Sequence, residues 1–339
     1  MVVLYVDDAF TIGDRGAINE MFEELKHNGI NITTEEHLED YISCEVVFNK
    51  TGTKAWLGQP HMIKKIRQAF GDQVAHLKGG TKTPGTPGFQ LMKPEEGEPA
   101  LSPELQSEFR SGVGMLLYLV KHSRPDIANC VRELTKGMSS APPHAYKEML
   151  RVIKHVLDTH GLGLKIFPII FKGKIVWHLL VYSDSDWAGD KANRKSISGF
   201  IFFFCGVPIM WRSKQQLAVS MSSSEAKWYA VSEAVKEIMF VLQVLISVGI
   251  AVETPVVVKV DNMGAIFMGK HSTTSARTRH ISCRLFYVRQ MQADQLISLE
   301  FVPTASNWSD GMTKNVKADV HTAHVPNYVC DKQDVGKEQ

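Results

Sequence analysis

Apolar positions in the first eighty residues alternate between strand-like and helix-like spacing. Residues 2–12 hold two short apolar runs around an acidic turn and predict a β-hairpin, and residues 17–27 have the spacing of a helix. Strand-like runs follow at 41–49 and 54–57, and helical spacing returns over 61–70. The first part of the chain is therefore predicted to combine a hairpin, two helices and two further strands.

A stretch rich in proline, glycine and glutamate then predicts a linker over residues 81–101. Beyond it, residues 102–119 and 143–159 have helical spacing. Ser102 is suited to cap the first of these helices, because Pro103 follows it at the first helical position.

From about residue 175 the pattern changes to strands. In order, it predicts strands at 176–182, 198–204 and 207–211, a helix from 223 to about 248, a strand at 256–260, helices at 263–268 and 277–293, a strand at 297–302, and a short helix at 306–314. This order predicts an antiparallel start joined to a βαβ-type end, which is an α/β layer architecture.

Composition and length indicate a globular protein of two or three domains. The chain has 339 residues, of which 44% are hydrophobic and 22% charged, and domains typically take roughly 100–200 residues. The net charge of +2 does not by itself indicate a nucleic-acid partner. Local basic clusters do occur, although each one alone is better explained as a solvated face. They are Lys64, Lys65 and Arg67; Lys191, Arg194 and Lys195; and Arg277, Arg279, Arg284 and Arg289.

The cysteines and apolar runs favour an intracellular protein, cytoplasmic or nuclear. Five scattered cysteines form no Cys-x-x-Cys pair, so neither a zinc site nor a disulfide framework is indicated. The apolar start meets Asp7 and Asp8 at once, which is too short for a signal peptide. The longest apolar run, 238–252, falls short of the ~20 residues of a membrane span, and no membrane partner is expected.

Four acidic residues lie where predicted elements begin or end. Asp184 and Asp261 each end a predicted strand, Glu225 follows three serines at a helix start, and Asp310 lies near the last helix. If the two strands are parallel neighbours, Asp184 and Asp261 emerge side by side at one sheet edge. Two-metal phosphodiester hydrolysis needs such converging carboxylates, and Mg²⁺ prefers hard oxygen ligands. The pattern therefore predicts a nuclease.

The same segments carry a resemblance to a known family. The C-terminal motifs read Tyr182-Ser-Asp-Ser-Asp-Trp-Ala-Gly-Asp190, Arg194-Lys-Ser-Ile-Ser-Gly-Phe200, Ser222-Ser-Ser-Glu-Ala226, Val260-Asp-Asn262, Arg277-Thr-Arg-His-Ile281 and Val302-Pro-Thr304, followed by Asp310. They resemble the ribonuclease H domain of copia-type LTR retrotransposon polyproteins. Tyr5-Val-Asp-Asp8 resembles the reverse-transcriptase signature, and segments at 56–65, 83–87 and 110–128 resemble its thumb and connection.

The resemblance implies a site, cofactors and a substrate. Asp184, Glu225, Asp261 and Asp310 would hold two Mg²⁺ ions, with Mn²⁺ as a substitute, and cut the RNA strand of an RNA–DNA hybrid. Asp186 is an alternative to Asp184 as the metal ligand of the first strand. Alternation along a strand puts both aspartates on the same face, so only the resemblance favours Asp184. Four residues would contact phosphates: Arg277, Arg279, His280 and Lys195. The alternative for His280 is a structural role at a helix start.

The implied fold is an α/β ribonuclease H-like mixed sheet of three antiparallel strands with parallel additions. Its helices follow a truncated reverse-transcriptase palm and thumb and a helical connection. The expected boundaries are a palm and thumb remnant at 1–80, the linker at 81–101, the connection at 102–170, the ribonuclease H-like domain at 171–325 and a frayed tail at 326–339.

Departures from the family pattern leave alternatives open. Asp7 and Asp8 match two polymerase aspartates, but the third lies upstream of Tyr5 in the family, so no polymerase activity is expected of this chain alone. Lys227 and Trp228 stand where relatives usually carry glutamate and tyrosine. The main expectation is a truncated fragment with ribonuclease H activity. One alternative is a 5′-truncated version of a full RNA-directed DNA polymerase that lacks its upstream segment. Another is an inert remnant or nucleic-acid-binding module.

Overall fold

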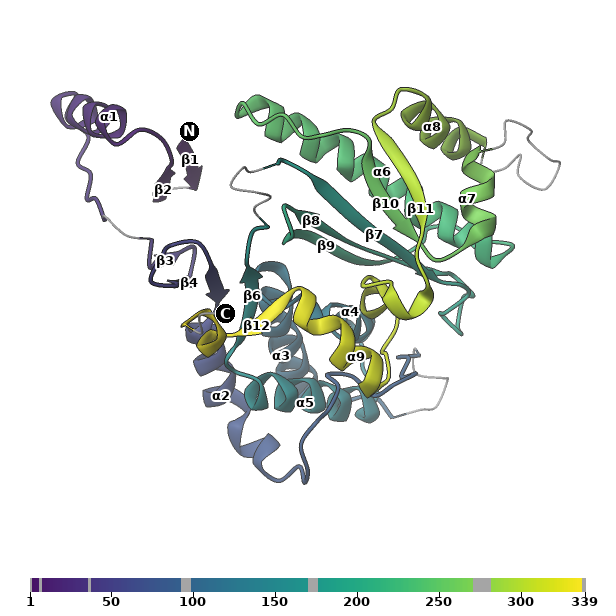
Figure 1. The fold of residues 1–339 in the computed structure, drawn as a ribbon. Coiled ribbons are helices and arrows are strands. Elements are labelled where there is room, and N and C mark those ends of the chain that lie inside the picture. Colours follow the sequence, from purple (N-terminus) through teal and green to yellow (C-terminus); the bar gives the residue numbers. More distant parts are fainter. Residues whose placement is uncertain are drawn as a thin grey trace.

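The structure is a computed structural model. It describes residues 2–5, 8–35, 38–92, 99–169, 176–270 and 282–336. The N-terminal hairpin of β1 (Val2–Tyr5) and β2 (Asp8–Thr11) pairs only within itself in the described part, and α1 (Arg15–His27) buries no side chain. Figure 1 shows this hairpin and α1 set apart from two larger sheets. None of the helices among the described residues is both long and apolar enough to cross a membrane.

The larger C-terminal sheet is mixed and has five strands in the order β11-β10-β7-β8-β9. Strands β7 (Leu179–Asp186), β8 (Ile197–Phe204) and β9 (Val207–Gln215) are antiparallel. Strands β10 (Val256–Val260) and β11 (Ile297–Phe301) add in parallel, with β10 beside β7. The predicted ribonuclease H-like sheet is confirmed in this order and direction of strands.

Alternation along the strands gives this sheet two apolar faces. On one face Val181 and Phe202 pack with helices α6 (Ser223–Ser247), α7 (Met263–Lys270) and α8 (Ser282–Ala293) in one buried cluster. On the other face a second buried cluster joins sheet and C-terminal residues: Tyr182, Ile201, Phe203, Met312, Val325 and Tyr328. The sheet is therefore covered on both sides, and its polar residues concentrate at the strand ends.

A second, antiparallel sheet has the order β12-β6-β5-β4-β3. Its strands are β3 (Asp40–Tyr41), β4 (Cys44–Phe48), β5 (Ala55–Gly58), β6 (Leu162–Ile166) and β12 (Val329–Asp331). The last strand of the chain therefore pairs with a strand that precedes the mixed sheet, as Figure 1 shows near the C-terminus.

Four helices form one core beside this second sheet. They are α2 (Pro60–Ala75), α3 (Pro103–His122), α4 (Ala128–Thr135) and α5 (Pro143–Asp158), and η1 (Pro125–Ile127) leads into α4. Ile66 and Phe70 of α2 are buried in the same cluster as Phe109 of α3 and Met149 of α5. Residues placed in separate thumb and connection segments by sequence thus share one interior.

Three sequence expectations are corrected by these contacts. The tail at 326–339 is not frayed over its described residues, because β12 pairs with β6 and Tyr328 is buried. The stretch 81–101 is not a free linker where it is described, since Leu91 is buried and Thr86 donates to Glu148. The short helix at 306–314 consists of 3₁₀ turns, η3 (Thr304–Ser306) and η4 (Asp310–Met312).

The remaining C-terminal elements follow η4. They are α9 (Ala318–His324), η5 (Val325–Asn327) and η6 (Lys332–Gly336). This segment returns the chain from the edge of the mixed sheet to the second sheet, so the two halves of the molecule are joined by its last residues.

Candidate functional site

The parallel pairing of β7 and β10 brings two predicted aspartates together. Ser183 of β7 is in register with Val260 of β10, so the residue after each, Asp184 and Asp261, stands at the same sheet edge. The parallel pairing on which the meeting of these two residues depends is therefore present. Both carboxylates are almost fully buried, with 1% and 3% of their side chains exposed, so each requires a partner.

Lys227 lies between these two carboxylates. Its Nζ is 2.6 Å from Oδ1 of Asp184 and 2.5 Å from Oδ1 of Asp261. The other carboxylate oxygens also accept hydrogen bonds, Asp184 Oδ2 from Thr313 Oγ1 at 2.6 Å and Asp261 Oδ2 from Thr304 Oγ1 at 3.0 Å. All four oxygens of the pair are therefore engaged by side chains of the protein itself.

This arrangement fixes the charges of Asp184 and Lys227. Burial would raise the pKa of Asp184, but the ammonium groups of Lys227 and Lys314 and the bond from Thr313 outweigh it, so that pKa lies below its usual range. Burial would lower the pKa of Lys227, and the two aspartates outweigh that effect and raise it. At neutral pH Asp184 is therefore a carboxylate and Lys227 an ammonium group.

Asp310 joins the site from the 3₁₀ turn η4. Its Oδ1 accepts from Lys314 Nζ at 2.6 Å. Burial and the neighbouring charge of Asp184 raise the pKa of Asp310 to about 6, although Lys314 opposes the shift. Three of the four predicted acids, Asp184, Asp261 and Asp310, thus converge on one edge of the mixed sheet.

Asp186 lies two residues beyond Asp184 on β7. Burial, followed by repulsion from Asp184, raises its pKa, and Lys314 counteracts this. The bonds from Lys227 and Thr313 go to Asp184. The geometry therefore gives the central position to Asp184.

Glu225 has a different role from the one expected. Ser222 caps α6, with its Oγ accepting from Glu225 N, and Glu225 Oε2 accepts from Met221 N at 2.9 Å. Residues two apart on an α-helix point about 200° apart, so the side chain of Lys227, not that of Glu225, is the one that faces the aspartates. In the described part of the chain, no three of the four predicted acids bring ligand atoms within 4.8 Å of one another.

The side chains as arranged do not fit the expected pair of Mg²⁺ ions. Mg²⁺ requires oxygen ligands at about 2.0–2.1 Å in near-octahedral geometry. The space between Asp184 Oδ1 and Asp261 Oδ1 is taken by the Lys227 ammonium, which already satisfies both oxygens. A divalent ion can bridge these carboxylates only if Lys227 leaves.

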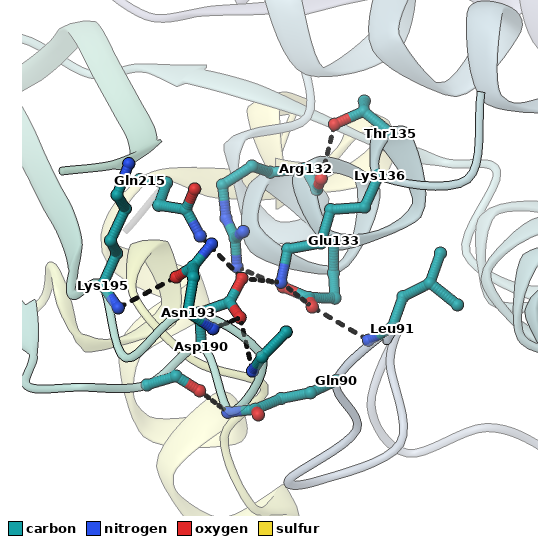
Figure 2. A network of polar contacts seen from close by, with 12 residues as sticks. Gln90, Leu91, Arg132, Glu133, Thr135, Lys136, Asp190, Asn193, Lys195 and Gln215 are labelled. Carbon is teal, nitrogen blue, oxygen red and sulfur yellow. Dashed lines mark hydrogen bonds and ion pairs between the residues drawn. The ribbon is translucent and has the colours of Figure 1, made fainter. Parts of the chain in front are cut away.

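Several other predicted residues lie outside the described part. They are Asp7, Arg277, Arg279 and His280, together with the side chain of Asp8. Lys195 is described, in the loop after β7, where its backbone N–H donates to Asn193 Oδ1. Figure 2 shows this loop held by Asp190, whose carboxylate accepts from Gln215 and pairs with Lys136. The loop that carries Lys195 is thereby attached to the end of α4.

The structure also contains a second cluster of side chains of kinds that can bind a metal ion, which the sequence did not predict. Asp126, His155 and His321 bring ligand atoms within 4.8 Å of one another. Both oxygens of Asp126, however, accept from the guanidinium of Arg124, whose charge opposes a cation there. Residues 124–126 stood within the motif at 110–128, which was the signal available in the sequence.

Comparison with known proteins gives the following matches. No family model matches the chain. Over 326 residues, 93% of the chain, it is 29% identical to a retrovirus-related Pol polyprotein from transposon TNT 1-94 of Nicotiana tabacum, of which it covers 23%. Over 210 residues, 61% of the chain, it is 31% identical to the Pol polyprotein from transposon RE1 of Arabidopsis thaliana, of which it covers 14%. It thus spans less than a quarter of the length of either relative.

Among solved structures, the chain is similar to LC11-RNase H1 in complex with an RNA/DNA hybrid. The match covers 42% of this chain and 96% of that one, with a TM-score of 0.31 and 11% sequence identity.

Proposed function

Because the chain is a homologue of the copia-type, retrovirus-related Pol polyproteins of transposons, we propose that residues 179–312 act as the ribonuclease H-type domain of such a polyprotein. In this proposal the domain binds an RNA–DNA hybrid at the edge where β7 and β10 end. The observation that carries it is the convergence of Asp184, Asp261 and Asp310 on that edge together with the ammonium groups of Lys227 and Lys314, which offset their negative charge. Ligands of open α/β sheets bind at the carboxyl ends of the strands.

The native site supports binding of an RNA–DNA hybrid better than it supports cleavage of the RNA strand. Phosphodiester hydrolysis at such a site depends on divalent cations that activate water and stabilise the leaving oxygen. Lys227 holds the carboxylates that would bind them, so no hydrolytic step follows from this arrangement. The two ammonium groups of Lys227 and Lys314 instead lower the negative charge that a phosphate backbone would meet.

Metal-assisted hydrolysis of the RNA strand is the second candidate. It is favoured by the retention of all three aspartates, whose oxygens suit Mg²⁺ or Mn²⁺. In this candidate the hybrid would have to displace Lys227 before a cation bound.

A single experiment separates the two candidates. The full chain is incubated with an end-labelled RNA–DNA hybrid, with duplex DNA and duplex RNA of the same sequence as controls, with and without Mg²⁺. Retarded migration of the hybrid on a native gel, with no shortened RNA on a denaturing gel, is the expected result. Shortened RNA in Mg²⁺ would establish the second candidate. The absence of any binding at low salt, where phosphate contacts are strongest, would exclude both.

A further inference from the structure

We infer that the ammonium group of Lys227 takes the place of a divalent cation between Asp184 and Asp261, so that the native site holds no bridging metal. One charge-reversing substitution, Lys227→Glu, converts this site into a divalent-cation site. The expected effect on hybrid binding rests on the proposed function. The expected effect on metal binding rests only on the geometry of Lys227 and the two aspartates.

Asp184 and Asp261 need a positive charge between them. Asp184 and Asp261 come from neighbouring parallel strands and are buried side by side. Two buried carboxylates repel each other and are strongly destabilised unless a positive charge lies between them. Lys227 supplies that charge with one nitrogen that bonds both Oδ1 atoms.

Lys227 also occupies the position that a metal ion would take. An ammonium group donates its hydrogens to the same oxygen atoms that a metal would use as ligands. The two remaining oxygens accept from Thr304 and Thr313, so every oxygen of the pair has a partner without any ion. A divalent cation entering here would have to break the bonds of Lys227 to both Oδ1 atoms and leave the ammonium group without these two partners.

The wider site becomes strongly negative when glutamate replaces Lys227. In the native chain, the carboxylates of Asp184, Asp261 and Asp310 are opposed by the ammonium groups of Lys227 and Lys314. With glutamate at 227, four carboxylates would face a single ammonium group. That excess of negative charge, built from hard oxygen ligands, is the environment that binds Mg²⁺ and Mn²⁺.

The direct test is metal binding, measured by titration calorimetry with Mn²⁺ on the full chain. The native chain is expected to show no saturable site over the titrated Mn²⁺ range. Lys227→Glu is expected to show one, with a Kd at least about tenfold below the highest Mn²⁺ concentration used. Adding Asp261→Asn to Lys227→Glu should abolish the gain. Lys236→Glu is the matched control, since it makes the same charge change at an exposed position of the same helix and should leave the chain without a site.

A neutral variant covers the case in which Lys227→Glu does not fold, as judged by circular dichroism. Lys227→Met removes the ammonium group and keeps a side chain of similar length, so it should bind Mn²⁺ more tightly than the native chain does. Native Mn²⁺ affinity equal to that of Lys227→Glu, or no gain in either variant, would overturn the inference.

Hybrid binding provides the second readout. The native chain should bind the RNA–DNA hybrid equally well in EDTA and in Mg²⁺. Lys227→Glu should bind it at least about tenfold more weakly in EDTA, because its uncompensated carboxylates repel phosphates, and should recover in Mg²⁺. If the native chain bound the hybrid only in the presence of Mg²⁺, the inference that Lys227 takes the place of the metal ion would be contradicted. If no variant binds the hybrid at all, the proposed function fails, and the calorimetry still decides the inference.

Discussion

Arg124 and Asp126 form a two-pronged ion pair in the interior of the molecule. Nε of Arg124 donates to Oδ1 of Asp126 at 2.8 Å and Nη2 donates to Oδ2 at 2.7 Å, with neither side chain exposed to solvent. Arg124 Nη2 also donates to Thr159 Oγ1 just beyond α5. Burial would raise the pKa of Asp126, but Arg124 outweighs it and the pKa is lowered. The pair therefore fastens η1 to the end of α5.

Replacing Arg124 with methionine should destabilise the protein by about 3–5 kcal/mol, because a buried carboxylate would lose its counter-ion. Urea denaturation followed by circular dichroism measures the loss. Lys26→Met is the control, since Lys26 and Glu23 are paired on the surface with 49% and 74% of their side chains exposed, where a pair contributes about 0–1 kcal/mol. Similar losses in the two variants would show that Arg124 and Asp126 do not act as a buried pair.

Glu225 should behave as a helix cap. Replacing it with alanine removes the acceptor for Met221 N and should lower the free energy of unfolding by about 1 kcal/mol. Glu225→Gln keeps an acceptor oxygen and should recover most of that loss in the same urea experiment. Neither variant should change the affinity for an RNA–DNA hybrid. Loss of the Mn²⁺ site of Lys227→Glu on adding Glu225→Gln would instead return Glu225 to the role of ligand.

Asp310 should make the protein less stable as pH rises. Its pKa is raised from 3.8 to about 6 in the folded state, so the folded state binds a proton more tightly than the unfolded state does. The stabilisation is complete below the unfolded pKa and is lost as pH rises through the folded pKa. A shift of this size corresponds to about 3 kcal/mol.

The measurement compares native protein and Asp310→Asn by urea denaturation across this pH range. The unfolding free energy of the native protein, taken relative to the variant, should decrease from about pH 4 to about pH 7. Parallel pH profiles for the two proteins would show that Asp310 does not titrate in this window.

Sequence patterns predicted the elements with strong local signals. Helix α3 begins as expected, with Ser102 at the cap and Pro103 at the first position. Strands β8 and β9 pair as expected across the turn at Cys205 and Gly206, both of which have positive φ. In both cases short-range spacing is sufficient. The order of elements leaves the parallel pairing of β7 with β10 as a condition, and the structure supplies it.

The position of Lys227 between the two aspartates cannot be predicted from local sequence patterns. Its departure from the family pattern is visible in the sequence, but the pattern predicts Glu225 as the ligand, because Glu225 follows the serines at the start of α6. A capping residue and a ligand are both expected in the first turns of such a helix. What separates them is the rotation of α6 relative to the sheet, and this depends on packing of residues such as Trp228 and Val231 against the strands. The charges of the site therefore became clear only in three dimensions.

The pairing of β12 with β6 also cannot be predicted from the sequence. Strand β12 has only three residues, and its partner Gly163 lies far back in the chain from Cys330. A short segment followed by charged residues has the pattern of a frayed end. Long-range pairing of this kind is determined by the apolar surface that the rest of the fold offers, here the cluster that receives Tyr328.

Tyr328 should accordingly be one of the more sensitive positions in the molecule, although it lies in a segment that looked like a loose tail. It is buried against Tyr182, Phe203 and Met312, and burial raises the pKa of its hydroxyl. Tyr328→Ala should cost about 3–5 kcal/mol, as for other large aromatic side chains removed from a core. Phe286→Ala is the matched control, because Phe286 is 60% exposed on α8 and such a change typically stays within about 0.5 kcal/mol. Both are measured by urea denaturation at one pH. If Tyr328→Ala cost no more than Phe286→Ala, the C-terminal segment would not be part of the folded core, and the pairing of β12 with β6 would have to be abandoned.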